Sequence, residues 1–75
     1  MRKLYVCNTR IGPFYIVESG GRYHPYYDGE PLGTYSNPQQ AVDDLASGQT
    51  FPIPGGTDTA ALGIPKDLSK WARFQ

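Results

Sequence analysis

Residues 22–48 constrain the fold more than any other segment, because they predict two strands joined by a tight turn and then a capped helix. The turn is Asp28-Gly29, which lies between two runs rich in β-forming residues. A two-residue hairpin turn needs positive φ at both central positions, which Asp tolerates and Gly adopts without strain. We therefore expect a β-hairpin with strands at residues 22–27 and 32–35.

The helix that follows the hairpin has sequence signals at both ends. Residues 36–37 offer an N-cap side chain, Pro38 occupies a position that needs no backbone donor, and Gly48 can adopt the left-handed conformation that ends a helix. The apolar side chains between these signals follow one narrow helical face, and they are Ala41, Val42 and Leu45. We expect this face to pack on the hairpin.

The segment before the hairpin predicts two more strands. They cover residues 4–8 and 14–18, with a loop at 9–13 between them and a turn at 19–21 after the second. The predicted fold class is therefore α+β, with a three- to four-stranded antiparallel β-meander, one helix packed on it, and a C-terminal tail with short helical turns. Such a sheet normally buries one face.

The turn also predicts the register of the hairpin and the face on which each side chain lies. A two-residue turn pairs Tyr27 with Glu30, Pro25 with Leu32, and Tyr23 with Thr34. We expect the helix to cover the more apolar set on that face, which is Tyr23, Tyr27 and Leu32. The candidate binding residues on the opposite, open side are Arg22, His24, Tyr26 and Tyr35.

The tail, residues 49–75, differs in character from the rest of the chain. Residues 51–56 contain two prolines and predict an extended strap, residues 57–63 predict a capped turn, and residues 65–74 predict a short helix. The tail either packs on the sheet or is a flexible segment that becomes ordered on a partner, and we favour packing. The apolar side chains that would pack are Phe51, Ile53, Leu62, Leu68 and Trp71. We expect one domain over residues 1–75, with residues 1–48 as its sheet and helix core.

Composition limits the compartment and the partners. The single cysteine excludes an internal disulfide, which favours the reducing cytoplasm. Residues 1–14 lack the apolar length of a signal peptide or a membrane span. Seven Lys and Arg balance seven Asp and Glu, so no overall positive field attracts nucleic acid or anionic lipid.

Few residues offer catalytic or metal chemistry. Cys7 and His24 are the only thiol and imidazole, and no local signature supports a nucleophilic pair. A metal site would have to combine them with carboxylates such as Asp43 and Asp44, whose spacing matches no ligand pattern and which we place on the solvated face of the helix. We therefore expect no enzyme, no cofactor and no metal.

Binding is the function that these residues leave open. Six Tyr, three Phe and one Trp suit a β-rich core or an aromatic binding face. A non-catalytic interaction module with a protein partner is the preferred hypothesis. The alternative is single-stranded nucleic acid bound through the open sheet face, which zero net charge disfavours.

Two longer motifs run through most of the chain. They are GRYHPYYDGEPLGTYSNPQQAVDDLASGQTF and LGIPKDLSKW, within residues 21–71. In these motifs the chain resembles a group of small bacterial proteins of unknown function. The resemblance implies a bacterial, cytoplasmic, free-standing domain whose tail belongs to the fold, and it implies no functional residue.

Overall fold

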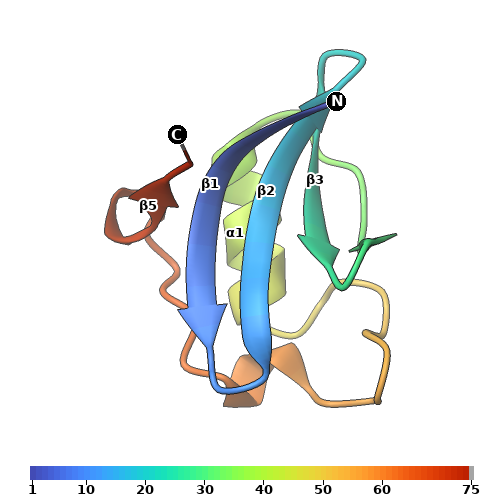
Figure 1. Cartoon of the computed structure of the whole chain (residues 1–75), viewed down its shortest axis with the longest axis vertical. Helices are drawn as coiled ribbons and strands as arrows, with labels where there is room; N and C mark the ends of the chain where they lie inside the picture. The colour runs from blue at the N-terminus through green and yellow to red at the C-terminus, as the bar shows by residue number, and fades with distance from the viewer. Residues whose placement is uncertain (75) are drawn as a thin grey trace.

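Five antiparallel strands form one sheet, in the order β4-β3-β2-β1-β5 (Figure 1). The computed structural model describes residues 1–74, so Gln75 of the predicted tail lies outside the described residues. The strands are β1 (Arg2–Thr9), β2 (Gly12–Ser19), β3 (Arg22–Tyr27), β4 (Glu30–Pro31) and β5 (Ala72–Arg73). The predicted α+β class is confirmed, but the sheet has five strands rather than the predicted three to four, because β5 joins it from the tail.

Tight turns connect the first three strands. The turn between β1 and β2 is held by Thr9, whose hydroxyl donates to the carbonyl of Gly12 at 2.8 Å and accepts from the amide of Ile11 at 3.2 Å. This turn replaces the five-residue loop expected at 9–13, so both strands are longer than predicted. Their pairing runs along most of both strands, with one shift of register between Lys3 and Tyr5.

The hairpin turn between β3 and β4 is confirmed, with φ of 52° at Asp28 and 78° at Gly29. The register is correct for Tyr27 with Glu30, and the Leu32 amide donates to the Pro25 carbonyl at 2.7 Å. The register predicted beyond that point is wrong.

Tyr23 pairs with Tyr35 rather than with Thr34, through two backbone hydrogen bonds of 2.9 and 2.8 Å. One extra residue is therefore accommodated after Leu32, as in a β-bulge. Gly33, with φ of 155°, lies in this segment. A shift of one residue moves a strand side chain to the opposite face, so Tyr35 faces the helix.

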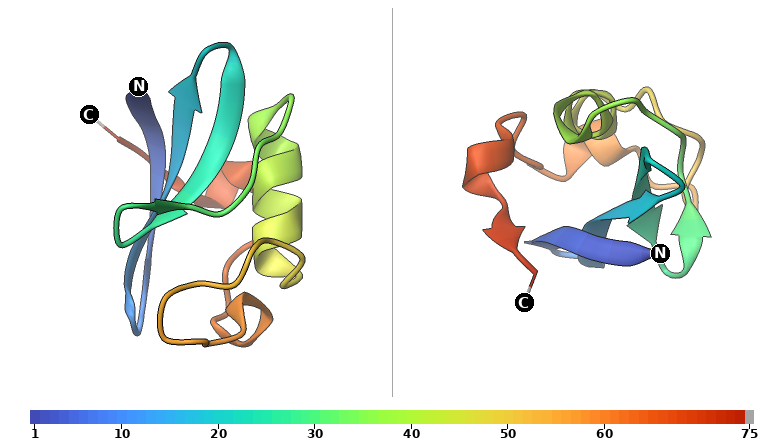
Figure 2. Two further views of the ribbon diagram at one scale, coloured as in Figure 1. Left: turned by 90° about the vertical axis from the view of Figure 1, so that its right-hand side faces the viewer. Right: turned by 90° about the horizontal axis from the view of Figure 1, so that it is seen from above.

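Helix α1 (Pro38–Ala46) lies across one face of the sheet, as Figure 2 shows in side view. The Asn37 side chain caps it by accepting from the Gln40 amide at 2.9 Å, and Gly48 follows its end with φ of 77°. The predicted stripe is confirmed, since Ala41, Val42 and Leu45 are fully buried. They pack with Phe14, Ile16 and Leu32 of the sheet and hairpin. Within residues 1–74, no helix is long and apolar enough to cross a membrane.

The tail packs beside the helix and completes the core. Its buried side chains are Ile53, Thr59, Ile64 and Trp71, and Leu62 and Leu68 pack against them. Phe51 was expected in this set but is 67% exposed. Its backbone makes the contact instead, because the Phe51 amide donates to the Leu32 carbonyl at 3.0 Å and the ring points outward.

Two short 3₁₀ turns replace most of the helical structure expected in the tail. The turn η1 (Thr59–Ala61) agrees with the predicted capped turn, and its cap is Asp58. The helix predicted at 65–74 is wrong, because only η2 (Leu68–Lys70) forms and the chain then extends into β5. A helix this short has little stability of its own, whereas the outer edge of β1 offers backbone groups for pairing.

Candidate functional site

One face of the sheet is left uncovered by α1 and the tail, and it is turned toward the viewer in Figure 1. We call it the open face. Strand register places on it the side chains of Lys3, Val6, Tyr15, Val17, Arg22, His24, Tyr26 and Pro31. Phe74 joins them at one corner, where its ring contacts Tyr15.

The structure brings together three of the four residues predicted for this face. Arg22, His24 and Tyr26 alternate along β3 and lie on it. The prediction for Tyr35 is wrong, because the shifted register turns its ring toward the core. Its hydroxyl donates to Asp44, which is therefore not on a purely solvated helix face as expected.

Aromatic rings dominate the middle of the open face. Tyr15 and Tyr26 are direct partners on the adjacent strands β2 and β3. Side chains opposite each other in this way have Cβ atoms about 4.5 to 5.5 Å apart. The ring of Phe74 meets Tyr15 edge to face, with 5.7 Å between centroids. The face thus offers a pair of neighbouring phenol rings and a third ring at its corner.

A lysine is held against these rings. The Nζ atom of Lys3 lies 4.3 Å from the centroid of Tyr15 and 5.4 Å from that of Phe74. None of these three residues was predicted for this face from the sequence. The alternation of β2 could have placed Tyr15 on this face, but Phe74 arrives only through β5, which no local signal predicts.

Carboxylates are absent from the open face within residues 1–74. Lys3 and Arg22 are its charged side chains. The seven acidic residues are distributed over the helix face of the sheet, the hairpin turn, α1 and the tail; they are Glu18, Asp28, Glu30, Asp43, Asp44, Asp58 and Asp67. A chain with no net charge therefore presents one face that is locally positive.

His24 is fixed in place by the bulged segment after β4. Its Nδ1 lies 3.1 Å from the Gly33 carbonyl and 3.3 Å from the Thr34 hydroxyl, so both contacts of the ring nitrogen come from this segment. The bulge that removes Tyr35 from the open face therefore also orients His24 on it.

Val17 shows that the open face is a packed surface. It lies between Lys3 and His24 in the register, yet it is only 1% exposed. It does not belong to the core between sheet and helix. Side chains of the open face must therefore cover it, which limits their motion and gives the surface a defined shape.

The structure does not bring the candidate catalytic or metal-binding side chains together. Cys7 pairs with Phe14 on the helix face, whereas His24 lies on the open face. Burial raises the pKa of the Cys7 thiol, which disfavours the reactive thiolate. In the described part of the chain, no three His, Cys, Asp or Glu side chains gather where they could hold a metal ion.

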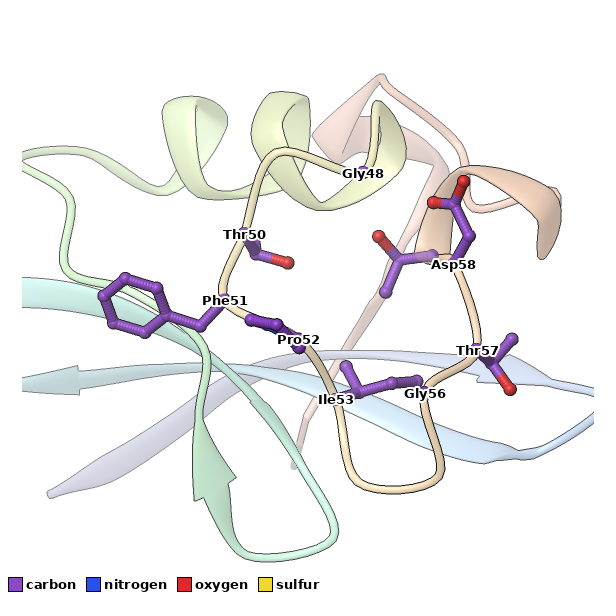
Figure 3. A pocket seen from close by; sticks show the side chains of 9 residues that line it. Gly48, Thr50, Phe51, Pro52, Ile53, Gly56, Thr57 and Asp58 are labelled. Atoms are coloured by element: carbon purple, nitrogen blue, oxygen red, sulfur yellow. The ribbon is translucent and has the colours of Figure 1, made fainter.

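The loop between α1 and η1 encloses a small hollow (Figure 3). Its volume is about 170 Å³, and threonines, glycines and the edges of Pro52 and Ile53 form most of its lining. Asp58 is its one ionisable residue, and Asp58 Oδ1 already accepts from the Ala60 amide at 3.0 Å. Typical ligand pockets are about 300 to 1,000 Å³, so this hollow is too small for most ligands.

Comparisons of the chain with protein-family models, with curated proteins and with solved structures found no match.

Proposed function

We propose that this protein is a non-catalytic binding module and that the open face is its binding surface. The observation that supports this most is the combination of three rings and two cations with no carboxylate on that face of residues 1–74. Such a surface favours partners that carry negative charge and flat or apolar groups. We also propose that the chain belongs with the small bacterial proteins it resembles and works in the cytoplasm.

A protein partner has one observation in its favour. Met1 and Phe74 are 84% and 42% exposed, and with Arg2 and Lys3 they line a shallow hollow of about 540 Å³ next to the open face. Exposed apolar side chains gathered in one place often mark a protein interface. This corner could hold an apolar side chain of a partner that also covers the rings.

The test is recovery of a partner from an extract of the cells that make the protein. Tagged wild type is compared with Arg22→Glu and Tyr26→Ala on the open face, and with the controls Phe51→Ala and Lys70→Gln away from it. Each variant is first shown to unfold at a temperature close to that of wild type.

We expect a partner that is recovered by wild type and by both controls and is lost with the two open-face variants. Treatment of the recovered material with nuclease or with protease then identifies the class of partner. Equal recovery by all five proteins would show that the open face is not the binding surface.

A further inference from the structure

We propose that the open face binds single-stranded nucleic acid, with bases stacked on Tyr15 and Tyr26 and phosphates held by Lys3 and Arg22. This inference rests on the proposed function, because it names the partner of the same face. It reverses the preference drawn from the sequence, which counted the charges of the whole chain rather than those of one face.

Two tyrosine rings lie side by side on the open face. Tyr15 and Tyr26 are cross-strand partners near the middle of the open face, on the adjacent strands β2 and β3. Unstacked bases bind to such rings, and the stacking tolerates any sequence because every base has a π-face. Phe74 extends the row at the edge next to Tyr15. The face can therefore accept two neighbouring bases, with a third at its corner.

Lys3 covers part of the Tyr15 ring, and this contact is weak enough for a base to replace it. A cation over an exposed ring contributes less than a base stacked on the same ring. The ammonium group lies 4.3 Å from the Tyr15 centroid, on a flexible and exposed side chain. An incoming base can displace it, and Lys3 then pairs with a phosphate beside the base.

The open face also carries positive charge beside the rings. Phosphate contacts dominate affinity for nucleic acid, and nearby carboxylates oppose them. Lys3 and Arg22 lie on β1 and β3, the strands that flank β2, and both are displaced from the ring pair toward the turn between β2 and β3. No carboxylate of residues 1–74 lies on this face, so no negative charge there offsets the charges of Lys3 and Arg22.

The edges of the sheet argue against an extended peptide that adds a strand. The outer strands β4 and β5 have two residues each, and Pro31 in β4 has no amide hydrogen to donate. A duplex is also a poor occupant, because its bases are already stacked and hidden from flat rings. The exposed bases of a single strand fit the rings without these obstacles.

The experiment measures fluorescence anisotropy with labelled mixed-sequence single-stranded DNA and RNA of about twelve nucleotides, within the range of known single-strand sites. A duplex of the same sequence is measured in parallel. Wild type should prefer single strands, with log K falling against log salt at a slope of about −1.4 for two phosphate contacts. The DNA and RNA arms show which nucleic acid is preferred.

Three open-face variants and two controls test the residues. Tyr26→Ala should weaken binding roughly ten-fold, and Tyr26→Phe should restore it because the ring is retained. Arg22→Gln should reduce the salt slope by about 0.7. Phe51→Ala removes a ring that is 67% exposed elsewhere, and Lys70→Gln removes a cation outside the open face, so neither should change binding.

The possible results separate this inference from the proposed function. No binding to single strands at low salt would overturn the inference, and a protein partner lost with Arg22→Glu would leave the proposed function standing. Oligonucleotide binding that Tyr26→Ala and Arg22→Gln leave unchanged would overturn the inference, because the oligonucleotide would then bind outside the open face. Equal affinity for the duplex would overturn base stacking as its cause.

Discussion

The hydroxyl of Tyr35 donates to Oδ2 of Asp44 at 2.9 Å, which joins the end of the bulged hairpin to the last turn of α1. Burial of the phenol, its hydrogen bond to Asp44 and the charge of that carboxylate together raise the pKa of Tyr35 from 10.0 to about 12. The contact keeps Tyr35 on the helix side of the sheet, and it depends on the extra residue after Leu32.

This contact predicts a loss of stability at high pH. The folded protein holds the Tyr35 proton more tightly than the unfolded chain, so the contribution is complete below pH 10 and is lost as the pH rises from 10 to about 12. Tyr35→Phe cannot ionise at this position, so the stability difference between wild type and variant should shrink across that interval. Urea unfolding at several pH values measures it, and a difference independent of pH would contradict the assigned pKa.

A buried hydroxyl fixes the tail to the end of the helix. Thr59 is 4% exposed, and its Oγ1 donates to the Leu45 carbonyl at 2.6 Å. Thr59→Val keeps the shape but removes the donor, so the free energy of unfolding should fall by about 1 to 2 kcal/mol. Thr57→Val is the control, because Thr57 lies in the same loop but is less buried than Thr59. Equal losses in denaturant unfolding would mean that the bond to Leu45 contributes nothing specific.

Gly48 is required for space as well as for its backbone conformation. A Cβ atom there would lie 2.6 Å from Asp58 Oδ1 and 3.2 Å from the Cβ of Ala60, whereas at Gly63 nothing lies within 4 Å. Both residues have similar φ, 77° and 71°. Gly48→Ala should therefore lower stability by about 1 kcal/mol or more beyond the loss in Gly63→Ala. The same loss in both would show that η1 can move away from the end of α1.

In the extended strap of the tail, residues 51–56, the side chain of Ile53 should contribute to stability and that of Phe51 should not. Ile53 is 4% exposed and Phe51 is 67% exposed. Ile53→Ala should cost about 2 to 4 kcal/mol, while Phe51→Ala should stay within about 0.5 kcal/mol of wild type. Fluorescence of the buried Trp71 can follow unfolding, together with circular dichroism of the backbone. A larger loss of stability in Phe51→Ala than in Ile53→Ala would mean that Phe51, and not Ile53, is the buried side chain of this segment.

Local signals in the sequence were sufficient to predict the elements that are determined by residues close together in the chain. The cap at Asn37, the proline at Pro38 and the turn at Asp28-Gly29 act within a few residues, and all were predicted correctly. The bulge after Leu32 was missed because nothing in strand alternation indicates an added residue. The pairing of β5 with β1 was missed because it depends on residues far apart in the chain.

The same distinction applies to the candidate site. Alternation along β3 was enough to group Arg22, His24 and Tyr26. Tyr35 was placed on the wrong face because its position follows from the bulge. Alternation along β2 could also have added Tyr15, whereas Lys3 and Phe74 required the pairing of β1 with β2 and β5. The local charge of a face likewise cannot be obtained from the total charge of the chain.

The pairing of β5 with β1 also sets an order of events during synthesis. A ribosome makes β1 first among the strands, but Tyr5 and Val6 receive their outer partners, Arg73 and Ala72, only when β5 has been made. The bond from the Phe74 amide to the Leu4 carbonyl, 2.9 Å long, forms equally late. Until then the edge of β1 exposes backbone groups to other nascent chains. A mutation that slows docking of the tail would therefore lower the yield of folded protein in the cell even where the stability of the finished fold is unchanged.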